Sequence, residues 1–444
     1  MRRLLYLALR WVSALDHRLK ERLTTAGWLA LGIGSAAAAA GLDTNLTVTY
    51  RAFAFLAALL LLSWIASVAM HRLRPTRVAV SRDLPRYATA GAPFAYRVTL
   101  VNRSARPLVG AQLAERFADP RPAFEDWARA REPGEERRNW FDRNAGYFRW
   151  RWLIDRRVPR EANGAELAPL APGEQRTLQL GFTPRRRGRI EMAGLTLRRP
   201  DPLGLVRDLS HVPLPARVVA LPRRYRLPEL SLPGRRKFQP GGVSLAASVG
   251  DSEEFLALRD YRPGDPLQRV HWKSFARTGK PVVKEYQDEF CERHALVLDT
   301  ASAGGEDAAF EDAVAIAASF VYTIDTHDCL LDLLFAGTEV HAYTAGGGQM
   351  HAGQMLEALA GVGPSAPEAF KGLAQAVLLR RDMLSSVIVV LLAWDEARAR
   401  FVSALRAGGF EVRVLLVGES AANAPPGVLH LVPGRIEEGL ARLK

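Results

Sequence analysis

The sequence predicts an α+β multidomain protein: an N-terminal transmembrane helical hairpin, a β-sandwich-like middle domain and a C-terminal α/β domain of Rossmann-like type. Three observations predict this order. Two long uncharged runs lie near the N-terminus, short β-forming segments between turn residues follow, and the last third alternates apolar strands with helices. The expected domains are a basic cytoplasmic segment at 1–22, two membrane helices at 23–70, a β-rich domain at 76–222, a connector at 223–292 and the α/β domain at 293–444.

The composition is that of a folded chain with a basic balance. Hydrophobic residues make up 48% of the 444 residues, and the formal net charge is +13, which excludes a disordered chain. Such a charge suits anionic lipid or nucleic acid. The basic residues do not gather into one run with interleaved aromatics, so nucleic-acid binding ranks lowest and no nucleic-acid partner is expected. Two cysteines form no disulfide framework and fit a reducing compartment.

The two uncharged runs predict membrane helices. No charge occurs from Leu23 to Leu42 or from Ala52 to Met70, and about 20 apolar residues cross a bilayer. Basic residues precede the first run and follow the second, whereas Arg51 is the only cation in the link between them. The positive-inside rule therefore places both termini in the cytoplasm, with the chain crossing the inner (cytoplasmic) membrane as a multi-pass protein.

A cleaved signal peptide is the alternative interpretation of the first run. The small residues Ala36 to Ala40 would offer a cleavage site. The charged lead before Leu23 is long for a signal peptide, and cleavage would leave the basic flank after Met70 on the wrong side. The hairpin is therefore the favoured prediction, with the lipid bilayer as the first expected partner.

The middle domain is predicted from short alternating segments. Ala95 to Asn102, Arg176 to Pro184 and Glu191 to Pro200 are rich in β-formers and separated by turn residues. Such spacing is typical of an antiparallel sandwich. A charged, Trp-rich stretch at 115–165 interrupts it. It is interpreted as an insertion with its own small core; interfacial contact with a membrane is the alternative.

The stretch from Gly250 to Phe290 is the most informative part of the chain. It reads GDSEEFLALRDYRPGDPLQRVHWKSFARTGKPVVKEYQDEF, in which polar side chains alternate with aromatic ones around an Arg-Pro-Gly-Asp turn. Arg can pair with Asp and stack on Trp or Tyr, so a buried polar cluster is expected to lock this connector against a neighbouring domain. The candidate residues are Arg259, Tyr261, Gly264, Asp265, Arg269, His271, Trp272, Ser274, Arg277 and Glu285.

This stretch resembles a known family. The run LRDYRPGD…RVHWKSFARTGKPVVKEYQDE, together with Phe182 to Arg207, is similar to the hallmark of domain-of-unknown-function family 58 (DUF 58). The resemblance implies two N-terminal membrane helices, a β-rich region and a C-terminal von Willebrand factor A-like domain. It also implies a partner, an AAA+ ATPase of MoxR type, and no established reaction.

The C-terminal domain is predicted to hold a parallel sheet covered on both faces, because continuous apolar strands alternate with helices from Arg293 onward. The order is similar to the von Willebrand factor A fold, whose metal motif D-x-S-x-S suits Mg²⁺. Asp299 supplies the carboxylate, but alanine stands at both serine positions. Asp299, Thr300, Ser302 and Asp395 therefore form a degenerate metal candidate, and no cofactor is expected; Asp395 is interpreted as a helix N-cap.

The leading functional hypothesis is a non-enzymatic, membrane-anchored adaptor that faces the cytoplasm and partners the ATPase. Phosphate-loop, zinc-protease and nucleophile-elbow motifs are absent from the sequence. The alternative is a hydrolase-like enzyme centred on His271 and Asp265, because titratable groups are dense between Arg259 and Arg277.

Overall fold

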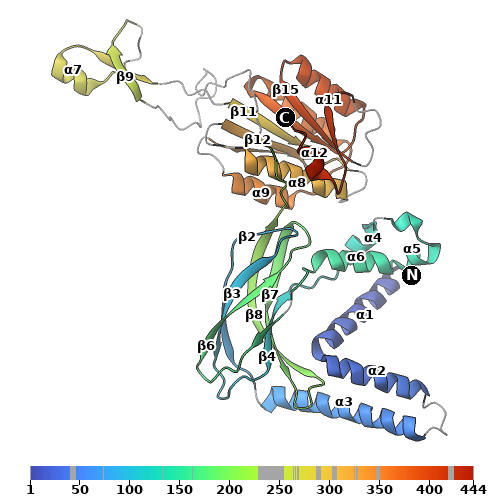
Figure 1. Cartoon of the computed structure of the whole chain (residues 1–444). Coiled ribbons are helices and arrows are strands. Elements are labelled where there is room, and N and C mark those ends of the chain that lie inside the picture. The colour runs from blue at the N-terminus through green and yellow to red at the C-terminus, as the bar shows by residue number, and fades with distance from the viewer. Residues whose placement is uncertain are drawn as a thin grey trace. The chain divides into compact units, whose positions relative to one another are not determined.

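The computed structural model is a mixed α+β chain that divides into two compact units, Met1–Arg223 and Arg224–Lys444 (Figure 1). Each unit is described by itself. The structure describes residues 2–40, 47–73, 75–132, 134–162, 164–228, 255–263, 265, 267, 270–286, 292–302, 308–324, 326, 329–346, 351–418 and 425–443.

Three helices open the first unit: α1 (Arg2–Arg22), α2 (Thr25–Ala40) and α3 (Thr47–Leu73). Within the described residues, one helix, Val48–Leu73, is long and apolar enough to cross a membrane. The second apolar helix, α2, has 16 residues and rises about 24 Å, less than the ~30 Å bilayer core. The turn of the predicted hairpin falls partly on 41–46, outside the described residues. Residues 2–22, expected only as part of a basic segment, form an amphipathic helix.

Two sheets share one apolar core in the middle of the unit. Antiparallel pairing of β1 and β6 with β3 gives the first sheet, and the long β7–β8 hairpin dominates the second. Val98 and Leu180 from the first sheet and Leu113 and Leu195 from the second are buried together. The three-stranded sheet holds β1 (Val78–Asp83), β3 (Phe94–Asn102) and β6 (Gln175–Phe182); the five-stranded sheet holds β2 (Tyr87–Thr89), β8 (Arg207–Leu221), β7 (Gly188–Pro200), β4 (Ala111–Phe117) and β5 (Ala165–Leu167).

The insertion predicted at 115–165 is shorter in the structure, because its two ends belong to strands β4 and β5. Between them lie α4 (Phe124–Arg129), η1 (Glu135–Arg137), α5 (Trp140–Ala145) and α6 (Tyr147–Arg157). Trp127 and Trp150 form a small core here, as expected for an insertion. Tyr6 of α1 completes that core, so the insertion also holds the N-terminal helix.

A buried carboxylate joins the tip of the β7–β8 hairpin to the apolar helices. Asp201 accepts hydrogen bonds from the backbone N–H groups of Leu203, Leu205 and Val206 at 2.9–3.0 Å. It also accepts one from the Ser63 hydroxyl of α3 at 2.7 Å. Leu205 packs with Ala30 and with the leucines at 56, 59 and 60. The β-rich domain is thus fastened to the middle of α3, because a buried carboxylate is stable only when such donors surround it.

A second polar cluster lies between the two sheets. Tyr96 of β3 donates to Glu115 of β4 at 2.6 Å, and Arg82 of β1 lies 3.1 Å from the same carboxylate. Burial raises the pKa of Glu115 to about 7, while the hydrogen bond from Tyr96 and the charge of Arg82 act in the opposite direction. Glu115 is therefore a titratable group inside the core.

The second unit is built on a six-stranded sheet with the order β13-β12-β11-β14-β15-β16. Its edge strand β13 is antiparallel to β12, so the fully parallel sheet predicted from the sequence is wrong at this edge. A tight turn at Gly337 joins these two strands, and a parallel pair would need a long crossover. The strands are β11 (Glu292–Leu298), β12 (Cys329–Ala336), β13 (Val340–Ala345), β14 (Ser386–Leu391), β15 (Glu411–Val417) and β16 (Val428–Leu431).

Helices cover this sheet, and α8 (Ala308–Thr323) is buried along most of its length. Tyr225, near the start of the connector, donates its hydroxyl hydrogen to Asp312 of α8 at 2.8 Å. Its backbone N–H donates to Ser319 of the same helix at 2.8 Å. The first residues of the connector are therefore attached to this unit. The other helices are α9 (Ala352–Gly361), α10 (Ala369–Leu379), η3 (Arg381–Met383), α11 (Glu396–Ala407) and α12 (Ile436–Leu440).

The junction between the hairpin tip and α2 predicts a large difference between two glycine substitutions in the same helix. A Cβ atom on Gly27 would lie 2.2 Å from the carbonyl oxygen of Leu205, whereas one on Gly32 would meet open space. We expect Gly27→Ala to lower the melting temperature in detergent, because overpacking costs roughly 1–3 kcal/mol. Gly32→Ala should leave it unchanged or raise it, since alanine favours a helix. Equal behaviour of the two variants would contradict the junction.

Glu115 predicts a pH dependence of the β-rich domain. Its folded-state pKa of about 7 lies above its ordinary value of 4.5, so the folded state holds the proton more tightly. The stabilisation is fully present below pH ~4.5 and is lost as the pH rises to ~7, by roughly 3 kcal/mol. Pulse proteolysis of the full chain in urea at several pH values measures this loss. Glu115→Gln should remove the slope, whereas the same change at the exposed Glu166 should not; a wild-type stability that rises over this interval would refute the assignment.

Candidate functional site

The end of strand β11 carries the predicted metal-site carboxylate. Asp299 follows Leu298 directly, and its backbone N–H donates to the carbonyl of Val390 in β14 at 2.8 Å. Because β11 and β14 are parallel, the loops after both strands meet at this edge of the sheet. Asp299 is completely buried. It accepts hydrogen bonds from the backbone N–H groups of Ala301 at 3.0 Å and Leu392 at 3.3 Å.

A guanidinium group lies beside this carboxylate. Arg398 of α11 donates from Nε to Asp299 at 2.7 Å and from Nη1 to Asp395. Its guanidinium also stacks on the ring of Phe370, 4.6 Å from the centroid. Burial raises the pKa of Asp299, and the charge of Arg398 lowers it again. The chain's own cation therefore bridges both carboxylates of the predicted metal candidate.

Thr300 and Asp395 are held by further hydrogen bonds, and the backbone N–H of Ser302 donates to the carbonyl of Ser365 at 3.3 Å. Thr300 shares a hydrogen bond with the Ser365 hydroxyl at 3.0 Å. Asp395 is the N-cap of α11, accepting from the backbone N–H of Arg398 at 2.9 Å. Among the described residues, no three His, Cys, Asp or Glu side chains gather as a metal site. The residues present do not fit a magnesium ion, because a cationic side chain stands where the ion would need free carboxylate oxygens. Sequence reasoning identified Asp299 and missed Arg398.

The family-like stretch folds as a small module, the signature module, made of β9 (Phe255–Asp260), α7 (Trp272–Thr278) and β10 (Val282–Tyr286). β9 and β10 pair antiparallel. Val270 and Val283 are buried between them and α7. The candidates Gly264 and Arg269 lie outside the described residues, as does the side chain of Glu285.

Two pairs of candidate residues come together in the signature module. Arg259 donates both Nη groups to Asp265 at 2.8 Å, and the backbone N–H of Arg262 donates to the same carboxylate at 2.8 Å. These contacts, led by the bond from Arg259, lower the pKa of Asp265 to about 2. His271 Nδ1 lies 2.6 Å from the Ser274 hydroxyl across the first turn of α7. Asp265 is thus bonded to Arg259 and to the backbone of Arg262 in the turn. The described side-chain hydrogen bond of His271 is to Ser274 and not to Asp265.

Other candidates of this module are exposed instead of buried. Trp272 is 60% and Phe275 38% exposed, and their rings meet edge to face with centroids 6.0 Å apart. Arg277 is exposed on the same helix, and Tyr261 donates its backbone N–H to Pro281 at 3.0 Å. Of the expected cluster, Arg259 and Asp265 are paired, whereas Trp272 and Arg277 are exposed. The paired polar groups hold the turn, and the aromatic side chains are left on the surface, since a module this small has little interior.

The Arg398 bridge predicts a large effect of removing one cation. Arg398→Met keeps the apolar stem but leaves Asp299 buried without its partner, so we expect the second unit to lose roughly 3–5 kcal/mol of stability. Urea denaturation measures the loss. The control is Arg400→Met, because Arg400 is an exposed arginine of the same helix and its loss should change little. Adding Asp299→Asn to Arg398→Met should recover part of the stability; equal effects at 398 and 400 would contradict the bridge.

Comparison with known proteins identifies part of the chain. A family model described as "Protein of unknown function DUF58" matches residues 257–427. The "Uncharacterized protein YeaD" of Bacillus subtilis (strain 168) is 26% identical over 176 residues, which are 39% of this chain and 42% of that protein. The match therefore spans less than half of the relative's length.

Similarities to solved structures are weak. The CARDB domain of the PF1109 protein from Pyrococcus furiosus has a TM-score of 0.17 at 13% identity, covering 33% of this chain and 86% of that chain. A β-glucosidase from Listeria innocua in complex with glucose has a TM-score of 0.17 at 12% identity, covering 33% and 16%. Neither likeness assigns a fold. The Asp299–Arg398 bridge, most of the six-stranded sheet and all of the signature module except the first two residues of β9 lie within the matched segment. Residues 257–427 are a DUF58 family domain.

Proposed function

We propose that this protein is a membrane-anchored adaptor that faces the cytoplasm and recruits an AAA+ ATPase through its signature module. The observation that carries the proposal is the exposed aromatic pair Trp272 and Phe275, held on a module in which Arg259 is paired with Asp265. Exposed aromatic side chains on a fixed scaffold are the usual anchors of protein–protein contacts. The MoxR-type partner class comes from the family resemblance.

The anchoring part of the proposal rests on α2 and α3. α3 is long enough to span a bilayer, and α2 packs beside it as a shorter apolar helix (Figure 1). With basic residues on both flanks, the pair would form the hairpin of a multi-pass inner-membrane protein with both termini in the cytoplasm. Tilting of α3 and thinning of the bilayer around α2 would accommodate their unequal lengths.

The C-terminal unit would act as a von Willebrand factor A-like binding module without an ion. Its strand order places the loops after β11 and β14 at one edge of the sheet. The Arg398 guanidinium holds these loops together, because it donates a hydrogen bond to Asp299 and stacks on the ring of Phe370. No catalytic role is assigned to this edge, because the carboxylates of Asp299 and Asp395 are both paired with Arg398.

An enzyme centred on His271 is the second candidate, favoured by the 2.6 Å contact between its Nδ1 and the Ser274 hydroxyl. A base beside a hydroxyl is the start of a nucleophilic site. The third member of such a site would orient the imidazole, and Asp265, the other residue of this hypothesis, is bound to Arg259 and to the backbone of Arg262. The adaptor is therefore the better supported function.

The adaptor hypothesis predicts the outcome of a pull-down from detergent-solubilised membranes. The full chain should recover an AAA+ ATPase, and Trp272→Ala with Phe275→Ala should reduce recovery at least ~10-fold, as expected when anchor residues are removed. The matched control is Trp140→Ala with Phe141→Ala, an exposed aromatic pair on α5 of the other unit, which should leave recovery unchanged. Absence of any AAA+ protein with and without ATP, or equal recovery by both double variants, would reject the hypothesis.

A further inference from the structure

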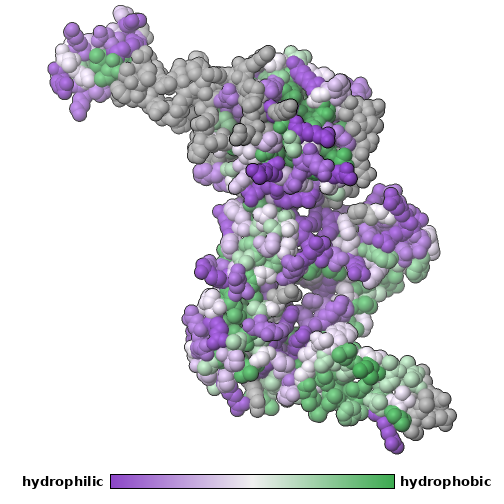
Figure 2. Space-filling view, viewed as in Figure 1, coloured by the Kyte–Doolittle hydropathy of each residue, from purple (hydrophilic) through white to green (hydrophobic). Residues whose placement is uncertain are grey.

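Helix α1 turns an apolar side away from the protein. Leu4, Leu7, Trp11 and Leu15 recur every three or four residues and so share one side of the helix. All four are exposed, and Trp11 is 69% exposed. In the space-filling view, hydrophobic surface covers α2 and α3 and extends along α1 (Figure 2). Such a side is unusual for a helix whose other surface already packs on its own domain.

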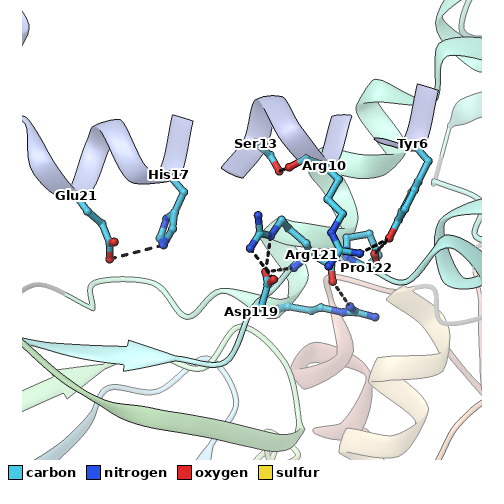
Figure 3. A network of polar contacts seen from close by, with 9 residues as sticks. Tyr6, Arg10, Ser13, His17, Glu21, Asp119, Arg121 and Pro122 are labelled. Carbon is cyan, nitrogen blue, oxygen red and sulfur yellow. Dashed lines mark hydrogen bonds and ion pairs between the residues drawn. The ribbon is translucent and has the colours of Figure 1, made fainter. Parts of the chain in front are cut away.

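The other side of α1 faces the protein. Figure 3 shows Tyr6, Arg10, His17 and Glu21 pointing from α1 toward the segment that holds Asp119 and Pro122. The Tyr6 hydroxyl donates to the carbonyl of Pro122 at 3.1 Å and accepts from Arg10 at 3.3 Å. Leu5 and Leu9 of the same helix pack with Tyr6 in the small core of Trp127 and Trp150. At about 100° per residue, Tyr6 and His17 lie across the helix from Trp11 and Leu15. α1 therefore has an exposed apolar side in addition to the one that packs on its own domain, whereas the surface helix of a water-soluble domain turns its apolar side inward.

The charges of α1 favour an anionic partner. The helix carries six basic residues and two acidic ones, a net charge of +4 (6 − 2). Arg18 and Arg22 follow Trp11 and Leu15 on the apolar side at helical spacing. A helix with an apolar stripe, a tryptophan and basic residues matches a membrane interface that contains anionic lipids. A protein partner would need a groove of the opposite charge along the whole helix.

Continuity with the apolar helices supports the same partner. α1 ends at Arg22 and α2 begins at Thr25, so two residues separate them. Leu23 pairs with Val206 at the hairpin tip, and Thr24 donates its hydroxyl hydrogen to Gly204 at 2.6 Å. Because this junction is fastened to the protein, α1 leaves the apolar pair in a fixed direction and runs toward α4–α6 (Figure 1).

We propose that the side of α1 formed by Leu4, Leu7, Trp11 and Leu15 lies in the interfacial layer of a bilayer that contains anionic lipids. The helix would lie along the membrane surface, with its other side against the β-rich domain and the insertion. This proposal rests on the proposed anchoring by α2 and α3, and it assigns a lipid-binding role to a segment expected from the sequence to be only a basic cytoplasmic tail.

Spin labels on single cysteines test the proposal in liposomes of phosphatidylethanolamine and phosphatidylglycerol. The full chain is used, with Cys291 and Cys329 replaced by serine and a cysteine placed at residue 7, 11 or 15. His17, on the opposite side of the same helix and exposed, is the matched control position, and Leu62, exposed on α3, reports the span. Accessibility to oxygen and to a water-soluble nickel complex is measured by power saturation.

We expect labels at 7, 11 and 15 to be several-fold more accessible to oxygen than to nickel, and the label at 17 to show the reverse. Replacing phosphatidylglycerol by phosphatidylcholine should reduce the ratio at 7, 11 and 15 and leave position 62 unchanged. Nickel accessibility at 7, 11 and 15 equal to that at 17 would overturn the proposal, whatever position 62 shows. A water-exposed label at 62 alone would instead overturn the anchoring. Dipolar broadening between labels at 11 would reveal a second copy as the occupant and also overturn the proposal.

Discussion

The hydrogen bonds of Asp201 are the interaction on which the first unit depends. A carboxylate buried against apolar helices is stable only when donors saturate it, and here three backbone N–H groups and the Ser63 hydroxyl do so. The same contacts shape the turn at the hairpin tip and seat that turn on α3. The position of the β-rich domain relative to α2 and α3 thus follows from one side chain. The placement of α1 follows in turn, because α1 is joined to this junction at one end and to the insertion at the other.

In both units, carboxylates that are largely shielded from solvent are paired with an arginine of the same chain. Glu115 lies between Arg82 and Tyr96 in the β-rich domain, and Asp299 meets Arg398 in the six-stranded sheet. Asp265 is held by Arg259 in the signature module. In all three places the acidic groups serve the architecture. Exposed aromatic and aliphatic side chains lie on α7 and on α1, and these surfaces are the ones to which we assign binding.

Much of the fold could be predicted because its signals are local. The uncharged runs coincide with α2 and α3, and the apolar runs after Arg293 coincide with the strands of the six-stranded sheet. Long-range pairs could not be predicted. Ser63 and Asp201 are 138 residues apart, and Asp299 and Arg398 are 99 apart. Asp299 was recognisable from its position after a strand, but nothing near it marks Arg398 as its partner. The exposure of Trp272 was also hidden, because apolar side chains in a short stretch indicate a core unless the module is too small to have one.

The bridge at the end of β11 also bears on how such a binding module could be controlled. A divalent ion can leave its carboxylates when its concentration falls, and modules that hold one can be switched in that way. A guanidinium is covalently part of the chain and keeps its charge at any physiological pH. An edge held by Arg398 would therefore be permanently assembled and indifferent to chelators. In the proposed complex with an AAA+ ATPase, switching would then come from the nucleotide cycle of the partner and not from an ion at this site.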